Sequence, residues 1–461
     1  MKYIHSAFLS LGLCALLSAP AFGYGWIPGR GEPIPVRESI EAMMRNNHSL
    51  KAIQENRSAV GHEIDRAKSG WGPRVDVVAR GGFGYLDNST TRSYGYDSAS
   101  PYSSASLIIT QPLWDGFRTL GRVREAEATY RSLDHRVMDN ATSLALDAII
   151  AHVDVLRRTE IYELARENVA AHESILDKAR QRAEQGVDTM ADVSQAQSRL
   201  ARAKSALSEA EAFLRIGEDT YTRLTDHVLT GVKLAPVDMP SSPYEDPRQV
   251  LEKARQGNPK MAAFKEDVEG ARARKMQAKA NYSPSVDIEA GPSYSDRDGK
   301  RELFTSEFGV AAVVRWNLFN SMADVHENKA AEARIRQARQ TLYDFSDELK
   351  LQVEESWAQL KTAKEQLAFY KEAVDYNLTT RDAYQEQFIL GQRSLLDVLD
   401  AENELFNSSS QAATAHGNAI IAAYRLKALT GELIPSFGIR TAILKVTPSD
   451  HEPLDSVTMP K

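Results

Sequence analysis

Asp397 and Asp400 are the acidic side chains whose spacing points most clearly to a shared task. Being three residues apart, they share one face of a helix, where two carboxylates concentrate negative charge. Asp397 also ends a Ser394-x-x-Asp397 pattern, as Asp192 ends a Thr189-x-x-Asp192 pattern. Such patterns cap helix starts, where the helix dipole favours a carboxylate. Capping and a role of the charge itself both stay open for Asp192 and Asp397, whereas a cap does not explain Asp400.

Catalytic patterns are missing from the sequence. The histidines are scattered, and no His-Glu-x-x-His, Gly-x-Ser-x-Gly or phosphate-binding loop occurs. Most Asp and Glu residues lie in helical patterns beside Lys or Arg, which is typical of solvated helix faces. The sequence therefore predicts a protein that is not an enzyme, with no catalytic residues, no cofactor and no metal ligands.

The first segment predicts export. Lys2 precedes an apolar run at 7–17 and a small-residue cleavage site at 19–21, so residues 1–23 are expected to be a secretory signal peptide. The only cysteine, Cys14, leaves with it, which excludes disulfides and cysteine catalysis. No later stretch is apolar enough for a membrane-spanning helix. A net charge of −7 without a long basic block argues against nucleic acid as a partner.

The chain contains an internal repeat. Residues 71–76 are echoed at 282–287, and residues 113–116 are echoed at 318–321. Gly186 and Gly391 keep the spacing of the second echo, and a single length change separates the two echoes. A tandem duplication with one loop insertion leaves this pattern.

The repeat defines the expected domains. Each half begins with a helical stretch, at about 35–69 and 246–280. We expect a first repeat over 24–235, a linker over 236–248, a second repeat over 249–434 and a tail over 435–461.

Four segments alternate between apolar and polar residues, as strands do when one face meets lipid. They lie at 75–85, 104–110, 286–290 and 304–316. Aromatic residues stand near their ends, as at a membrane interface: Trp71, Trp114, Tyr282, Trp316 and Phe319. A soluble two-sheet sandwich is the alternative interpretation of the strands alone.

Long helical runs follow the strands in both halves. The intervals from Gly116 to Gly186 and from Ser321 to Gly391 contain no proline. At about 1.5 Å per residue, each run would reach roughly 100 Å, which no compact domain accommodates. Apolar residues recur every seven positions, as in a coiled coil, at Ala148, Val155, Tyr162 and Val169 and at Val353, Leu360, Leu367 and Val374.

Four strands cannot close a barrel, and lipid does not tolerate an open sheet edge. The chain is therefore expected to oligomerise. Two copies would give eight strands and a filled interior, whereas three would give twelve strands with room for an aqueous lumen.

The sequence resembles the TolC-type outer-membrane channels over essentially the whole mature chain. The resemblance is strongest at 391–401 and 430–433, and the first-half counterpart is 186–197. It implies a mainly α-helical homotrimer in the outer membrane of a Gram-negative bacterium. Its twelve-stranded β-barrel, four strands per chain, would continue as a coiled-coil helical barrel across the periplasm. The implied partners are outer-membrane lipid, a periplasmic adaptor, and an inner-membrane ABC or proton-driven transporter.

The resemblance also implies roles for residues at the periplasmic tip. Asp397 and Asp400 match carboxylates that ring the narrowest opening, and Asp192 matches their first-repeat partner. Arg393 matches a basic residue that ties neighbouring helices in the closed state.

The hairpin tips are the expected adaptor docking region, with Gly186, Gly391, Val193 and Val398. Two positions depart from the family pattern. Phe388 replaces a tyrosine, and Ala191 replaces a threonine, so the hydrogen-bonded latch is expected to differ.

The sequence is compatible with three functions. The leading one is a passive exit duct for type I protein secretion, and the first alternative is the outer-membrane component of a multidrug or small-molecule efflux pump. The second alternative is a periplasmic coiled-coil adaptor or structural protein that forms no channel, for which membrane-type strands would have no use.

Overall fold

The computed structural model describes residues 32–95, 99–229, 232–241, 244, 246–297 and 303–439. The expected signal peptide, with Cys14, lies outside the described residues, and so does most of the 435–461 tail. The expected linker is described only in part.

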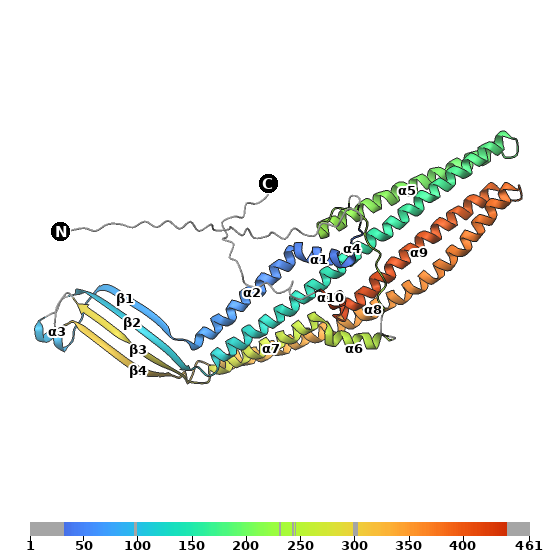
Figure 1. The fold of residues 1–461 in the computed structure, drawn as a ribbon. Helices are drawn as coiled ribbons and strands as arrows, with labels where there is room; N and C mark the ends of the chain where they lie inside the picture. Colours follow the sequence, from blue (N-terminus) through green and yellow to red (C-terminus); the bar gives the residue numbers. More distant parts are fainter. Residues whose placement is uncertain are drawn as a thin grey trace, which may run out of the picture.

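Four strands form one antiparallel sheet at one end of the molecule, in the order β1-β2-β3-β4 (Figure 1). Their bounds are β1 Arg74–Gly84, β2 Ser100–Trp114, β3 Ser285–Arg297 and β4 Thr305–Arg315. A short helix, α3 (Ser89–Tyr94), lies between β1 and β2. Within this sheet β1 and β4 are the edge strands, each with a partner on one side.

The two faces of the sheet differ in chemistry. Val77 in β1 and Val310 in β4 are about seven-tenths exposed, although both are apolar. Side chains alternate between the two faces along a strand. Arg74 is three positions from Val77, and Glu289 pairs with Ala311, the neighbour of Val310, so both charged residues lie on the opposite face. This alternation gives one apolar face and one polar face, as the sequence predicts for strands between lipid and water.

Two long helical hairpins extend away from the sheet. The first joins α4 (Arg118–Glu184) to α5 (Met190–Thr225), and the second joins α8 (Ala323–Ile389) to α9 (Leu395–Leu429). Both α4 and α8 have 67 residues, which corresponds to roughly 100 Å. Their tips lie at the end of the molecule opposite the sheet (Figure 1).

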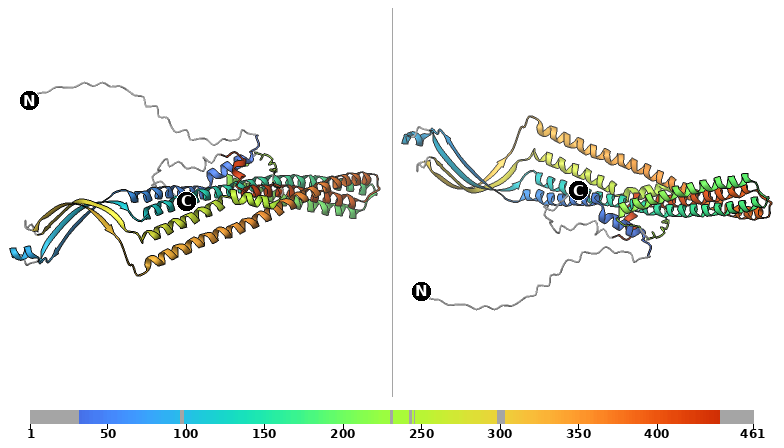
Figure 2. Two further views of the ribbon diagram at one scale, coloured as in Figure 1. Left: turned by 90° about the horizontal axis from the view of Figure 1, so that it is seen from below. Right: turned by 90° about the horizontal axis from the view of Figure 1, so that it is seen from above.

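Shorter helices complete the fold. They are α1 (Val36–Asn46), α2 (His48–Lys68), the 3₁₀ turn η1 (Ser69–Trp71), α6 (Pro247–Gly257), α7 (Pro259–Ala280) and α10 (Leu433–Ser436). Figure 2 shows α2, α4, α7 and α8 spreading side by side toward the sheet, in the order in which they contact one another.

Each expected helical stretch before the strands is divided into two helices. Asn47 ends α1 and caps α2, its side chain accepting a hydrogen bond from the Leu50 N–H at 3.0 Å. Asn258 does the same between α6 and α7, bonding the Met261 N–H at 3.0 Å, with Pro259 at the first helical position. A capping side chain in extended backbone interrupts the helix, and a proline cannot continue it from the preceding turn.

The core follows the long helices as separate clusters. The largest packs α1, α4 and α9 midway along the molecule and includes Ile40, Ala148, Ile149 and Tyr424. Of the residues with seven-residue spacing, Ala148, Val155, Val169, Val353, Leu360 and Leu367 are buried. The predicted fold class is therefore confirmed as mainly helical with a four-stranded antiparallel sheet. Within the described residues, none of the helices is long and apolar enough to cross a membrane.

Candidate functional site

The tips of the two hairpins are built alike. Gly186 and Gly391 have φ angles of 76° and 74°, a left-handed conformation that glycine adopts without strain. In each tip the backbone N–H of the residue after the glycine donates a hydrogen bond to a carbonyl in the last helical turn. The bond joins Val187 N–H to Arg182 O at 2.9 Å in the first tip and Gln392 N–H to Gln387 O at 2.8 Å in the second. A side chain at either glycine would meet open space, so the turn conformation sets this requirement.

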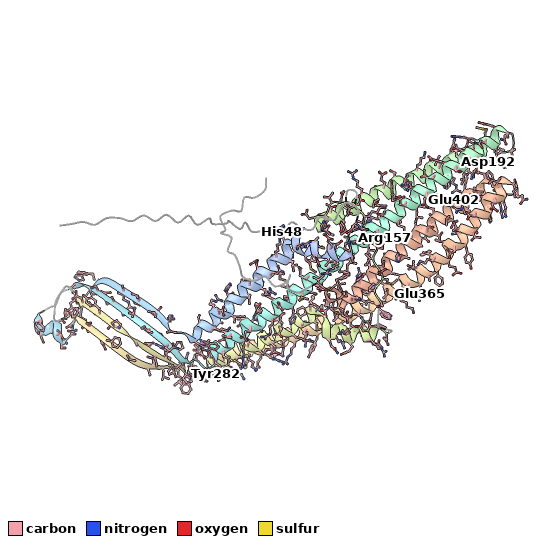
Figure 3. The ribbon with its side chains drawn as sticks, viewed as in Figure 1. His48, Arg157, Asp192, Tyr282, Glu365 and Glu402 are labelled. Carbon is pink, nitrogen blue, oxygen red and sulfur yellow. The ribbon has the colours of Figure 1, made fainter. Side chains whose placement is uncertain are left out.

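Asp192 lies near the first tip (Figure 3) and closes the cap of α5. Its Oδ2 accepts hydrogen bonds from the Thr189 backbone N–H at 3.0 Å and from the Thr189 hydroxyl at 2.7 Å. These bonds stabilise the ionised form and lower the pKa of the Asp192 carboxyl. Asp192 therefore caps α5, as its Thr189-x-x-Asp192 pattern predicts, and its carboxylate is charged.

Asp397 lies in the first turn of the matching helix, α9, of the second hairpin. Its Oδ2 accepts a hydrogen bond from the Ser394 hydroxyl at 2.8 Å, and the Arg393 guanidinium lies 3.8 Å from the same oxygen. Arg393 also donates to Gln387 Oε1 at 3.1 Å and lies 4.1 Å from the centre of the Tyr384 ring. Both candidate gate residues on this loop are therefore held by neighbours within their own hairpin.

Asp400 has a partner that the sequence does not reveal. Its Oδ1 accepts a hydrogen bond from Arg199 Nη2 at 2.7 Å, across from α9 to α5. The Asp400 side chain is 54% exposed and that of Arg199 is 25% exposed. Asp400 thus carries its own counter-charge within the chain. Because the two residues are far apart in sequence and on different helices, no local pattern pairs them.

A buried carboxyl lies further along α9. Glu402, labelled in Figure 3, is 4% exposed and accepts a hydrogen bond from the Gln385 amide at 2.7 Å. Burial raises the pKa of this carboxyl, while the nearby Arg381 guanidinium opposes the rise. It is a functional candidate that the motif analysis missed.

The expected docking valines do not face outward. Val193 and Val398 are buried in a cluster that joins the two hairpins, with Ile175, Phe388 and Leu399. They therefore depart from the expected docking role, because their side chains pack inside the chain. Exposed apolar side chains instead surround the tip glycines: Val187, Met190, Ile389, Leu390 and Leu396.

The five predicted interface aromatics gather where the sheet meets the helices. Tyr282 is labelled at this junction in Figure 3, and all five side chains are exposed. Trp114 donates its indole N–H to the Ser283 hydroxyl at 3.1 Å, and Trp316 donates to the Tyr282 carbonyl at 3.2 Å. An apolar ring with a satisfied polar end suits a boundary between lipid and water.

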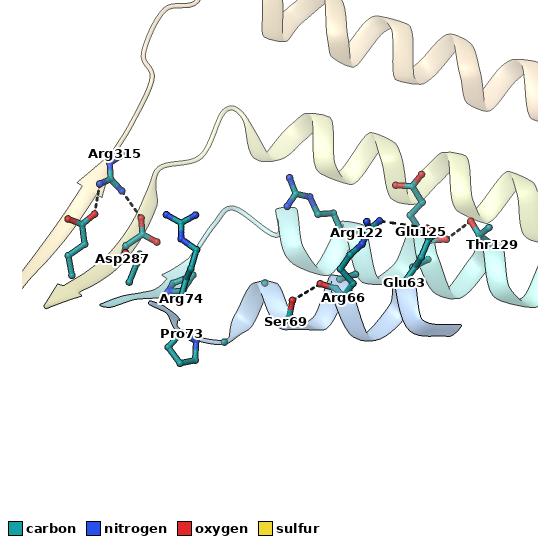
Figure 4. Close-up of a pocket in the computed structure, with 17 residues that line it drawn as sticks. Glu63, Arg66, Ser69, Pro73, Arg74, Arg122, Glu125, Thr129, Asp287 and Arg315 are labelled. Atoms are coloured by element: carbon teal, nitrogen blue, oxygen red, sulfur yellow. Dashed lines mark hydrogen bonds and ion pairs between the residues drawn. The ribbon is translucent and has the colours of Figure 1, made fainter. Parts of the chain in front are cut away.

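A cavity of about 1100 Å³ opens on the polar face at the same junction (Figure 4). Arg315 crosses from β4 to two carboxylates of β3, reaching Asp287 at 2.9 Å and Glu289 at 2.5 Å. Arg74 and Arg122 also line the cavity. The cavity is therefore polar and charged, whereas the outward sheet face beside it is apolar. Among the described residues, no group of three or more His, Cys, Asp or Glu side chains could hold a metal ion.

These elements together define a class of protein: a membrane-type sheet continued by long paired helical hairpins. The solved structure of the outer membrane protein VceC from Vibrio cholerae has this fold. It matches with a TM-score of 0.74 and 15% identity, covering 86% of this chain and 96% of that one.

The family follows from sequence comparison. The family model described as outer membrane efflux protein matches residues 40–224 and 250–432, and the chain belongs to that family. Outer membrane protein TolC of Vibrio cholerae is 24% identical over 446 residues, covering 94% of this chain and 96% of that protein. Alkaline protease secretion protein AprF of Pseudomonas aeruginosa is 24% identical over 452 residues, covering 94% and 89%.

The resemblance to TolC-type channels is thereby confirmed, and so is the predicted location. The protein is an outer-membrane protein that extends into the periplasm, as its relatives are. The family is described as outer membrane efflux proteins, and solved structures of the same fold are described as channels, not enzymes.

Proposed function

We propose that this protein is the outer-membrane exit duct of a tripartite export machine, a passive channel for type I protein secretion. The observation that carries the proposal is the four-stranded sheet, whose β1 and β4 edges have partners on one side. Its outward face is apolar, and its inner face carries the charged cavity at the junction. A sheet of this kind in lipid requires neighbours at both edges.

Three copies of the chain supply those neighbours. Pairing β4 of one copy with β1 of the next closes twelve strands, which leaves an aqueous lumen. The long hairpins then continue the lumen as a helical tunnel through the periplasm. We assign the two halves of the chain, 24–235 and 249–434, to structural repeats that each contribute two strands and one hairpin to this trimer.

The tips provide the docking surface for a periplasmic adaptor, which joins the duct to an inner-membrane ABC or proton-driven transporter. Gly186 and Gly391 hold the turns, and the exposed apolar residues Val187, Met190 and Leu390 offer the contact area. Apolar side chains clustered at an exposed tip favour a protein partner. The junction aromatics fix the depth of the barrel in outer-membrane lipid.

The constriction lies at the same tips. Asp397 and Asp400 from three chains place six carboxylates there, with Asp192 beside them and Arg393 bridging the loop. A ring of carboxylates attracts cations and repels anions. Because Arg199 and Arg393 lie beside two of these carboxylates, the selectivity depends on the balance of both signs of charge.

Bilayer recordings of the purified protein test the channel. We expect heat-stable trimers from outer membranes that conduct ions. A protein recovered in the soluble periplasmic fraction, or trimers that conduct no ions, would falsify the proposal in favour of the coiled-coil adaptor alternative.

The cargo is tested separately in a deletion strain. Identity to AprF, which is named for alkaline protease secretion, supports a protein cargo, while the family description favours efflux. We expect the deletion to remove a protein from the culture medium, with restoration by the plasmid-borne gene. An unchanged medium together with lower inhibitory concentrations of drugs would instead identify an efflux duct.

A further inference from the structure

Arg182, at the end of α4, contacts both hairpins at the tip. Its Nε and Nη2 bond the Asp188 carboxylate in the loop of its own hairpin, at 2.9 and 3.2 Å. Its guanidinium lies 4.6 Å from the centre of the Phe388 ring in the second hairpin, and its Nη1 donates to the Phe388 carbonyl at 3.3 Å. One side chain thus uses both its flat face and its donor edge to join the two hairpins.

The surroundings strengthen each of these contacts. The side chains of Arg182 and Asp188 are only 21% and 13% exposed, and Phe388 is 4% exposed. Partial removal from water increases the strength of a charge-assisted hydrogen bond and of a cation over an aromatic ring. The Phe388 carbonyl also belongs to the last turn of α8, where the helix dipole favours a positive charge.

The corresponding contact in the second hairpin does not cross. Gln387 and Arg393 stand at the positions that correspond to Arg182 and Asp188. In the first hairpin the earlier residue of the pair donates the hydrogen bond, whereas in the second hairpin the later residue, Arg393, donates it. Arg393 then lies over Tyr384 of its own helix. Equivalent positions therefore close a loop in both hairpins, but Arg182 alone of these two arginines reaches across.

We propose that Arg182 is the clasp that positions the gate, holding the first hairpin against Phe388 of the second. This rests on the proposed channel function. Release of the clasp lets the hairpins separate at the tip and widens the constriction lined by Asp397 and Asp400. The face of the Phe388 ring accepts the cation, and the buried cluster around the ring excludes water.

Conductance of purified trimers tests the clasp. We expect Arg182→Gln and Phe388→Leu each to raise the ratio of open to closed time by about five- to thirtyfold, the range that one cation–π contact supports. The double variant should match Arg182→Gln, because Arg182→Gln already removes the ring contact together with the hydrogen bond to the carbonyl of residue 388, which Phe388→Leu leaves in place. Arg182→Lys, which keeps the charge without the planar fork, should fall between wild type and Arg182→Gln.

Arg180→Gln is the matched control, because Arg180 lies on the same helix turn, is half exposed and, within the described part of the chain, pairs only with Asp177, at 3.7 Å. It should leave the open time unchanged. Spin labels on Val187→Cys and Leu390→Cys provide a readout independent of conduction, in a chain whose only cysteine is Cys14. When Arg182→Gln is added, the mean distance between the two labels should increase and the distribution of distances should broaden.

The outcomes separate the two proposals. Conducting wild-type trimers with unchanged open times and label distances in Arg182→Gln and Phe388→Leu would overturn the clasp and leave the channel intact. A wild-type trimer without conductance would overturn the channel, and the label distances would still report whether Arg182 holds the hairpins together. If Arg182→Gln fails to assemble, Phe388→Leu and Arg182→Lys decide the question.

Discussion

Asp400→Asn and Arg199→Gln should change the ion selectivity of the channel in opposite directions. The two side chains form one ion pair per chain, with 2.7 Å between Asp400 Oδ1 and Arg199 Nη2. Neutralising the carboxylate leaves one uncompensated positive charge at this pair in each chain, whereas neutralising the guanidinium leaves one uncompensated negative charge. A trimer multiplies either change by three.

The size of the effect follows from Coulomb's law. A unit charge about 10 Å from an ion interacts with it by about 0.4 kcal/mol in a water-like dielectric. Three such charges give about 1 kcal/mol, which screening at 0.1 M salt reduces to about a third. Cations and anions respond with opposite signs, so the ratio of their permeabilities should change about fourfold, and roughly tenfold or more at 0.01 M salt.

Reversal potentials across a planar bilayer with a potassium chloride gradient measure this ratio. Cation preference should fall for Asp400→Asn and rise for Arg199→Gln, and the double variant should return to the wild-type value because the net charge is restored. Shifts of the same sign, or reversal potentials unaffected by both substitutions in conducting trimers, would refute a position of this pair at the constriction.

Four other substitutions test the packing and the pH dependence of the fold. Gly431→Ala should lower the thermal unfolding temperature by several degrees, because its Cβ would lie 2.1 Å from the Gly257 carbonyl oxygen and its φ is 75°. Leu399→Ala should cost about 2–5 kcal/mol of stability, while Leu396→Ala, at an exposed position, should leave the unfolding temperature unchanged and weaken adaptor binding. Burial lowers the pKa of His152, so the stability it contributes above pH 6.5 should be lost as pH falls, and His152→Gln should flatten unfolding temperatures measured from pH 5 to 7.5.

The His152 prediction has a structural basis in a buried chain of hydrogen bonds. His152 Nε2 lies 2.9 Å from the Ala235 carbonyl, which can only accept, so this nitrogen carries the proton in the neutral ring. Nδ1 then accepts from the Ser39 hydroxyl at 2.9 Å, and Ser39 lies 2.6 Å from the Tyr221 hydroxyl. A second proton on the ring would force this chain to reverse. A steeper loss of stability at low pH in His152→Gln than in wild type would contradict this account.

The sequence by itself determined the local structure of the protein. Alternation of apolar and polar residues predicts the four strands, and the proline-free runs predict the long helices, because both signals repeat within a few residues. Gly186 and Gly391 mark the tips, since their turns need a left-handed backbone. The capping of Asp192 and Asp397 also follows from neighbours three residues away.

Only the tertiary structure decided which of these residues meet. The Arg199–Asp400 pair and the Arg182–Phe388 contact join different hairpins, and the inward burial of Val398 depends on how α9 is rotated against α4. One residue along a helix turns the side chain by about 100°, so the face that a residue presents to a distant helix is fixed by packing. Residue types marked the tip as important, but the balance of charge there and the contact that holds it together arise from packing between helices.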